Sequence, residues 1–288
     1  MSHPEQSTDQ EFAQLKQRMK ASWMAGDFGQ IARKLANGAE EFIARLELKP
    51  GMRVLDVGCG SGNQSIPAAR TGADVTGVDI AANLLEQARQ RAAEENLKIQ
   101  FDEGDAEQLP YGDGQFDAVL SMFGAMFAPR PEEVASEFKR VCRAGGLIAM
   151  ANWTPESFVG KTFRVNNKYW PPPKVAAPVL WGDPEVVRER FGADVSLQMQ
   201  KRIVIFDLPM SPEGAVDFFR EYFGPTRVAF SRLDADGQQR MRVDLVALWT
   251  ENNLGDADHV KVQAEYLEVH GRRGKIVSKA VPHGLKPC

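Results

Sequence analysis

The sequence has little cysteine and no long apolar run, and both shortages narrow what the protein can be. Its three cysteines, Cys59, Cys142 and Cys288, are far apart and odd in number, so they form no metal-binding or redox motif. Such usage is typical of the reducing cytoplasm, where we expect the protein to act. No apolar run approaches the roughly 18 residues that a membrane span needs. The polar start, MSHPEQSTDQEF, lacks the apolar core of a secretory signal.

An excess of positive charge is also missing. The formal net charge is −4, from 35 Lys and Arg against 39 Asp and Glu, and the isoelectric point is about 5.7. Nucleic acids and anionic membranes favour a broad basic face on their protein partners. We therefore expect a small-molecule ligand, with neither nucleic acid nor membrane as a partner. The sequence does not distinguish a monomer from a homodimer.

Between residues 50 and 153, short apolar runs alternate with amphipathic stretches. The runs predict five strands: MRVLDV, ADVTGVD, KIQFDEG, FDAVLS and GLIAMANW. Helices are expected over 61–70, 81–96 and 131–143. Strands that alternate with helices predict an α/β fold with a doubly wound, largely parallel sheet.

The segments on either side of this core differ from it in their sequence patterns. Residues 1–49 repeat apolar positions every three or four residues, which predicts an N-terminal helical lid. Residues 154–192 are rich in proline and aromatics, so we expect an irregular substrate cap without a long helix. Residues 193–271 carry two more strand patterns with a helical insert, and 272–288 read as a flexible basic tail.

The stretch VLDVGCGSG places a glycine-rich turn after a buried strand. A dinucleotide fingerprint, G-x-G-x-x-G, would need glycine where the chain has Asn63. Asp56 precedes the turn, and its carboxylate would repel a pyrophosphate but attract a cation at close range. The stretch therefore favours a positively charged ligand, such as a sulfonium.

Two further acids end the next strand patterns. Asp79 ends VTGVD, where a carboxylate can accept hydrogen bonds from both hydroxyls of a ribose. Asp105 follows the third strand, where it can accept a hydrogen bond from an adenine amino group. Together the three acids suit S-adenosylmethionine better than a nicotinamide dinucleotide.

These motifs also carry a family resemblance. VLDVGCGSG, VTGVDIAANLLEQAR, GDAEQLPYGDGQFDAVLS and VCRAGGLIAMANW resemble, in order, the motifs of class I S-adenosylmethionine-dependent methyltransferases. Within that class they resemble the type 11 branch, which includes the ubiquinone and menaquinone C-methyltransferases. The resemblance covers about residues 50–153. It implies a Rossmann-like, seven-stranded sheet in which an antiparallel last strand lies between the fifth and sixth strands.

The resemblance also implies how individual residues meet the cofactor. Gly58 and Gly60 would approach the methionine part, with Asp56 supporting its ammonium group. The residues implied at the ribose, the adenine and the reactive methyl group are Asp79, Ile80, Asp105, Ala106 and Ser121.

The sequence does not identify a catalytic base. His259 is the only histidine that the topology places on the rim of the site, and Tyr169 is a second candidate. We therefore expect in-line methyl transfer to a small, partly apolar acceptor that is already nucleophilic or is activated by its own acidity. No metal is expected. The residues expected around the acceptor are Met122, Phe123, Met126, Phe127, Trp153, Tyr169, Trp170 and Trp181.

Other functions remain compatible with the residues alone. One is an NAD(P)-dependent oxidoreductase with an imperfect dinucleotide fingerprint. Asp56 and Asn63 are evidence against this function. Another is a non-catalytic protein that keeps the cofactor fold. Methylation of RNA or DNA would need a basic cleft, at which only the RRGK stretch hints.

Overall fold

A seven-stranded mixed sheet forms the centre of the computed structural model, which describes residues 4–171 and 173–274. The strand order is β3-β2-β1-β4-β5-β7-β6, and β7 runs antiparallel to both of its neighbours. The predicted fold class is therefore confirmed, including the position of the last strand. The strands are β1 (Arg53–Val57), β2 (Asp74–Asp79), β3 (Ile99–Glu103), β4 (Phe116–Met122), β5 (Cys142–Trp153), β6 (Val195–Leu208) and β7 (Val260–Arg273).

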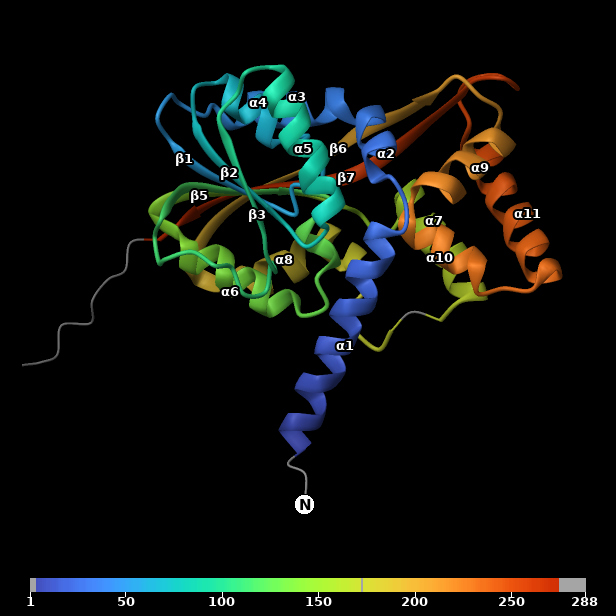
Figure 1. The fold of residues 1–288 in the computed structure, drawn as a ribbon, viewed down its shortest axis with the longest axis horizontal. Helices are drawn as coiled ribbons and strands as arrows, with labels where there is room; N and C mark the ends of the chain where they lie inside the picture. The colour runs from blue at the N-terminus through green and yellow to red at the C-terminus, as the bar shows by residue number, and fades with distance from the viewer. Residues whose placement is uncertain (1–3, 172, 275–288) are drawn as a thin grey trace, which may run out of the picture.

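Helices cover both faces of this sheet (Figure 1). One face carries α3 (Ala36–Leu46), α4 (Ser65–Arg70) and α5 (Ala82–Glu94), and the other carries α6 (Pro131–Val141) and α8 (Pro184–Phe191). Strands buried on both sides need apolar residues at successive positions rather than at alternate ones. This is why RVLDV and FDAVLS read as nearly continuous apolar runs.

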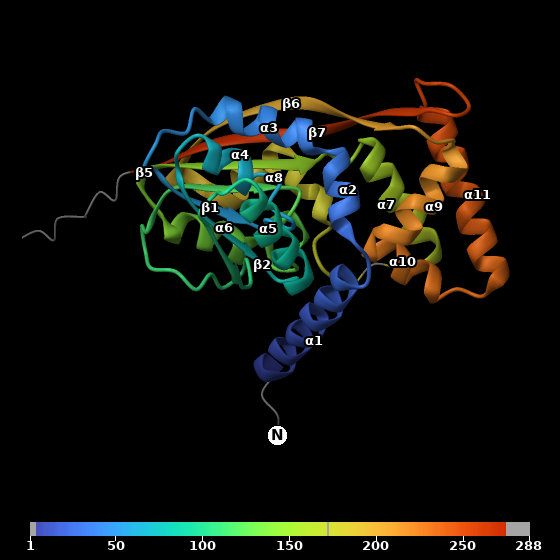
Figure 2. The same ribbon diagram turned by 45° about the horizontal axis from the view of Figure 1, so that its top comes forward.

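A second group of helices lies beside the far ends of the long strands β6 and β7 (Figures 1 and 2). Ser157, Ser211 and Asp234 begin three of these helices, and each side chain accepts a hydrogen bond from a backbone N–H in the first turn. The group comprises α7 (Phe158–Tyr169), α9 (Pro212–Tyr222), α10 (Gly224–Ser231) and α11 (Ala235–Asn252).

The N-terminal segment forms two further helices. The first, α1 (Pro4–Met24), projects with its early turns beyond the rest of the molecule, and α2 (Phe28–Lys34) follows it (Figures 1 and 2). Among the residues that the structure describes, no helix is both long and apolar enough to cross a membrane. Short 3-10 turns complete the fold: η1 (Ala125–Phe127), η2 (Pro178–Gly182) and η3 (Gly192–Asp194).

Three expectations about local structure are corrected. The cap over 154–192 is not irregular, because α7 and α8 lie within it. Pro155 precedes α7, and the proline-rich run begins at Pro171, after α7 has ended. The helix expected over 61–70 starts only at Ser65, since residues 61–64 form a turn. Arg272 and Arg273 belong to β7 and not to a tail. The remainder of the predicted tail, 275–288, lies outside the described residues.

Candidate active site

The carboxyl ends of β1, β2 and β4 surround a cavity of about 1090 Å³. We call it the first cavity. It lies where the strand order changes direction, between β1 and β4, which is the usual ligand position in an open α/β sheet. Of the predicted cofactor residues, six line this cavity: Gly58, Gly60, Asp79, Ile80, Asp105 and Ala106.

The glycine-rich turn after β1 forms the floor of the first cavity. Gly58 and Gly60 have φ angles of +70° and +52°, which side chains other than glycine rarely adopt. A Cβ atom on Gly58 would lie 2.8 Å from the Cα atom of Gly124, so the backbones after β1 and β4 touch there. A Cβ atom on Gly60 would meet nothing within 4 Å. The space beside Gly60 is therefore open to a ligand.

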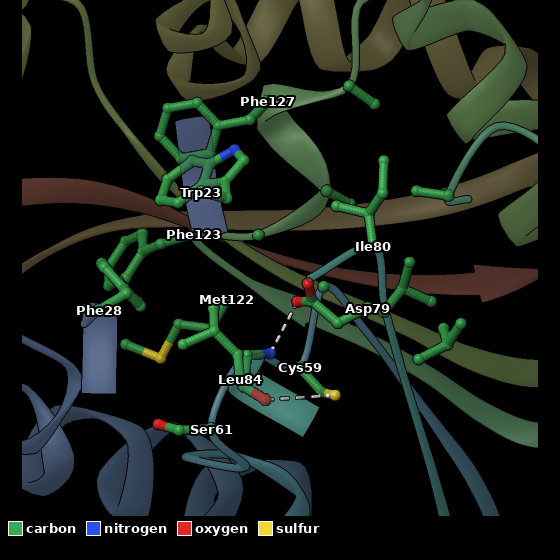
Figure 3. Close-up of a pocket in the computed structure, with 18 of the residues that line it drawn as sticks. Trp23, Phe28, Cys59, Ser61, Asp79, Ile80, Leu84, Met122, Phe123 and Phe127 are labelled. Carbon is green, nitrogen blue, oxygen red and sulfur yellow. Dashed lines mark hydrogen bonds between the residues drawn. The ribbon is translucent and has the colours of Figure 1, made fainter. Parts of the chain in front are cut away.

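Asp79 is held in place by backbone groups. Its Oδ2 atom accepts a hydrogen bond from the N–H of Gly60 at 2.8 Å (Figure 3). Its Oδ1 atom accepts one from the N–H of Ala81, also at 2.8 Å. Burial raises the pKa of Asp79 above its usual value, although these hydrogen bonds oppose the rise. Each carboxylate oxygen keeps a free lone pair, so the group can still accept hydrogen bonds from two hydroxyls.

Asp56 lies beneath the glycine turn and does not line the cavity. It is 0% exposed, and its Oδ2 atom accepts a hydrogen bond from the Ser65 hydroxyl at 2.6 Å. The Oδ1 atom has no hydrogen-bond partner within the described part of the chain. Burial, assisted by the negative charge of Asp79 and opposed by the hydrogen bonds from Ser65, raises the pKa of Asp56 to about 7. A cation bound above the turn would favour the ionised form of this carboxyl group.

Asp105 is engaged by the N-terminal helix. The Nζ atom of Lys16, on α1, lies 2.6 Å from Asp105 and 2.5 Å from Glu107, whose side chain is fully buried. Lys16 itself lines the first cavity, as do Met19 and Trp23 from the same helix. Lys16 could not be identified from the sequence, because Asp105 lies 89 positions away along the chain. Residues of α1 therefore line the cavity, and the lid expected over residues 1–49 stays a prediction.

A second cavity, of about 750 Å³, adjoins the first. Figure 3 shows that aromatic side chains gather on one side of the first cavity, while Asp79 and Ile80 lie on the other. Phe123 has a left-handed φ of +59°, and its ring stacks on Trp153 with 3.6 Å between centroids. The residues that line both cavities are Trp23, Phe28, Leu35, Phe123 and Phe127.

Half of the predicted acceptor residues line these cavities: Met122, Phe123, Phe127 and Trp153. Met126 and Trp181 do not, because both are 1% exposed within the hydrophobic core. Ser121 is corrected as well. Its hydroxyl is buried and accepts a hydrogen bond from the backbone of Ala125, so it shapes the turn after β4 without reaching the cavity.

The remaining candidates lie outside both cavities. The Tyr169 hydroxyl donates a hydrogen bond to Asp244 at 3.0 Å. Trp170 is 42% exposed, with the Arg232 guanidinium over its ring. The His259 imidazole is hydrogen-bonded to Asp207 at the surface. None of these three lines the space where a methyl acceptor could bind.

Sequence reasoning missed the aromatic residues from the helical group and β6. They are Phe158, Phe163, Phe206, Phe219, Phe223 and Trp249. The stretch FFREYF, at the end of α9 and the residue after it, was a usable signal, because its aromatic residues are too many for one buried stripe.

Comparisons with known proteins agree with this architecture. Residues 55–150 match the family described as "Methyltransferase domain". The uncharacterized protein Rv1403c of Mycobacterium tuberculosis is 41% identical over 212 residues, which are 72% of this chain and 77% of that protein.

Two solved structures share the fold. The YcgJ protein of Bacillus subtilis has a TM-score of 0.58 at 18% identity, over 83% of this chain and 99% of that one. Phosphoethanolamine N-methyltransferase 2 of Haemonchus contortus, solved with S-adenosylhomocysteine, has a TM-score of 0.50 at 18% identity, over 83% of this chain and 52% of that one. The chain therefore belongs with Rv1403c and its relatives, carries a match to the methyltransferase domain over residues 55–150, and shares the Rossmann-like fold of the two solved structures.

Proposed function

We propose that the protein transfers a methyl group from S-adenosylmethionine to a small, apolar acceptor. One observation carries the proposal: of two adjoining cavities, only the first has ionisable side chains among its described lining residues. The first is bordered by carboxylates at the ends of parallel strands, and the second is lined almost wholly by apolar side chains. A positively charged nucleoside donor suits the first cavity, and an apolar acceptor suits the second.

The residues of the first cavity fit this donor. Asp79 offers two anchored oxygens to a ribose, and the open side of Gly60 leaves room for the methionine part. The unpartnered oxygen of Asp56 lies beneath the turn and would favour positive charge above it. When bound, the donor supplies both the methyl group and its leaving group. The role predicted for Asp105 at the adenine requires that it share its carboxylate with Lys16.

The protein's own contribution is to align the reactants and keep water out. Phe123 and Phe127 border both cavities, so they lie where the two reactants would meet. Alignment of two bound groups can supply effective molarities on the order of 10⁵ M or more. His259 and Tyr169 are bonded to other residues away from the cavities, so the acceptor has to arrive as a nucleophile.

Calorimetry with S-adenosylhomocysteine tests the donor half of the proposal. We expect saturable binding, and no comparable binding of NAD⁺ or NADP⁺; the reverse result would favour an oxidoreductase. The acceptor half is tested with Phe163→Glu, which places a carboxylate in the second cavity only.

This variant should bind S-adenosylhomocysteine normally and lose methyl transfer. The matched control is Val243→Glu, at a position that is 54% exposed, and it should change neither property. Donor binding without transfer to any of a broad set of apolar acceptors would contradict the enzymatic function.

A further inference from the structure

Among the residues that the structure describes, those that line the second cavity include no ionisable side chain. Eleven of its eighteen residues are Phe or Trp, and the others are aliphatic apart from two threonines. Thr162 donates its hydroxyl hydrogen to the backbone oxygen of Phe158 at 2.9 Å, and Thr226 is 4% exposed. The cavity therefore offers neither a base nor a counter-charge to the molecule that it binds.

The lack of a base restricts the reacting atom. Alcohols, phenols and thiols lose a proton when they are methylated, and a positioned base normally removes it. Among the described residues, Asp79 and Asp105 are the acids that could take up a proton near the reactants. Both border the first cavity, and each already accepts a hydrogen bond from the backbone or pairs with Lys16. The acceptor that suits the second cavity is one that has no proton to lose.

The lack of a counter-charge restricts the charge of the acceptor. An anion would leave water for a cavity in which no lining cation compensates it, and such burial is costly. Aromatic faces attract cations instead. At the junction of the two cavities, the Trp23 ring meets Phe28, Phe127 and Phe223 edge to face, with centroids 5.6, 5.0 and 5.6 Å away. This aromatic junction suits a product that carries positive charge.

We propose, on the basis of the function proposed above, that the acceptor is an apolar tertiary amine and that the product is a quaternary ammonium ion. The nitrogen lone pair forms the new N–CH₃ bond. The electron pair of the breaking S–CH₃ bond returns to sulfur, which becomes a neutral thioether. One positive charge moves from sulfur to nitrogen, and no proton is transferred.

The same lining selects between the protonation states of such an amine. A protonated amine carries an N–H donor, and the lining has no carboxylate to accept its hydrogen bond. The neutral amine and the quaternary product carry no N–H group, so neither leaves a buried donor unsatisfied. The apolar lining favours an amine that carries a hydrocarbon or aromatic body.

A matched pair of probes tests the charge preference on the full chain with S-adenosylhomocysteine bound. Trimethyl(2-phenylethyl)ammonium and the neutral (3,3-dimethylbutyl)benzene have the same shape but differ by one charge. Calorimetry should show roughly tenfold tighter binding of the cation. The variant Phe219→Leu should reduce this preference, and Trp170→Leu, outside both cavities, should keep it. Equal binding of the two probes, or no binding of the cation, overturns the proposal.

Turnover provides an independent readout. With S-adenosylmethionine present, N,N-dimethyl-2-phenylethylamine should gain one methyl group, and kcat/KM should rise with pH as more of the amine becomes neutral. A phenol of similar size and 3-phenylpropionic acid should remain unmethylated. Methylation of the phenol or the acid in place of the amine would refute the amine assignment while upholding the methyltransferase function. Failure of S-adenosylhomocysteine to bind would instead refute the proposed function itself.

Discussion

Replacing Asp56 by asparagine tests how the buried carboxyl group beneath the glycine turn affects stability. Asp56 is 0% exposed, and burial raises its pKa from 3.8 to about 7. The folded protein therefore holds a proton on this group at pH values where the unfolded chain has lost it. Stability from this group is full below the unfolded pKa and is lost as pH rises through the folded pKa. The asparagine side chain cannot ionise, so the variant lacks this pH dependence.

The magnitude follows from the width of that pH window. Each pH unit between the two pKa values changes the free energy of unfolding by about 1.4 kcal/mol. Between pH 5 and pH 7, the wild-type protein should therefore lose about 2 kcal/mol relative to Asp56→Asn. Above pH 8 the difference between the two proteins should stay constant. The absolute stability of the variant matters less, because its buried amide brings a cost of its own.

Urea denaturation of both proteins from pH 5 to pH 8.5 measures this difference. Ser65→Ala is a second variant, because the Ser65 hydroxyl donates to Asp56 and lowers its pKa. Without that hydrogen bond the pKa of Asp56 should be higher, so the loss of stability should continue to higher pH in Ser65→Ala than in the wild type. A difference that is flat from pH 5 to pH 7, or that has the opposite sign, would refute the reasoning about the buried carboxyl group.

Three further predictions concern other parts of the structure. Gly58→Ala should lower the melting temperature of the free protein more than Gly60→Ala, because only the former brings Cβ within 2.8 Å of another backbone; equal effects would contradict this. Glu268→Gln should cost about 3 kcal/mol at pH 7, since Glu268 is 3% exposed and pairs with Arg45. Despite burial, its ionic partners lower the pKa of Glu268 to about 2, so urea denaturation should show the difference shrinking as pH falls from 4.5 toward 2. Lys16→Met should accelerate hydrogen exchange in α1, and unchanged exchange would show that the Lys16 ion pairs do not hold this helix.

The core of the fold could be predicted because its strands are buried on both faces. Such strands leave continuous apolar runs in the sequence, and the acids that follow them are conspicuous. Asp79 and the two turn glycines therefore came directly from the sequence, and the structure brings them together. The direction of β7 came from the resemblance to a family and not from the residues.

The second cavity could not be predicted in the same way. Composition indicates how many aromatic residues must be buried, but not which of them face a cavity and which fill the core. Trp181 was expected at the acceptor and lies in the core, whereas Phe219 was overlooked and lines the cavity. The pairing of Lys16 with Asp105 joins residues 89 positions apart, and no local pattern reports such a contact. The expectation of an irregular cap extended the effect of Pro171 backward into α7, although a proline restricts only its near neighbours.

The most direct test of the account compares the affinity of two variants for S-adenosylhomocysteine by calorimetry. Asp79→Ala removes the carboxylate proposed to hold the ribose, and Asp113→Ala removes an exposed carboxylate that pairs with Arg140 at the surface. Two hydrogen bonds to a charged group contribute about 3 kcal/mol or more, so Asp79→Ala should bind roughly 100-fold more weakly or worse. Asp113→Ala should bind as the wild type does. Equal affinity of both variants and the wild type would contradict the proposed donor site.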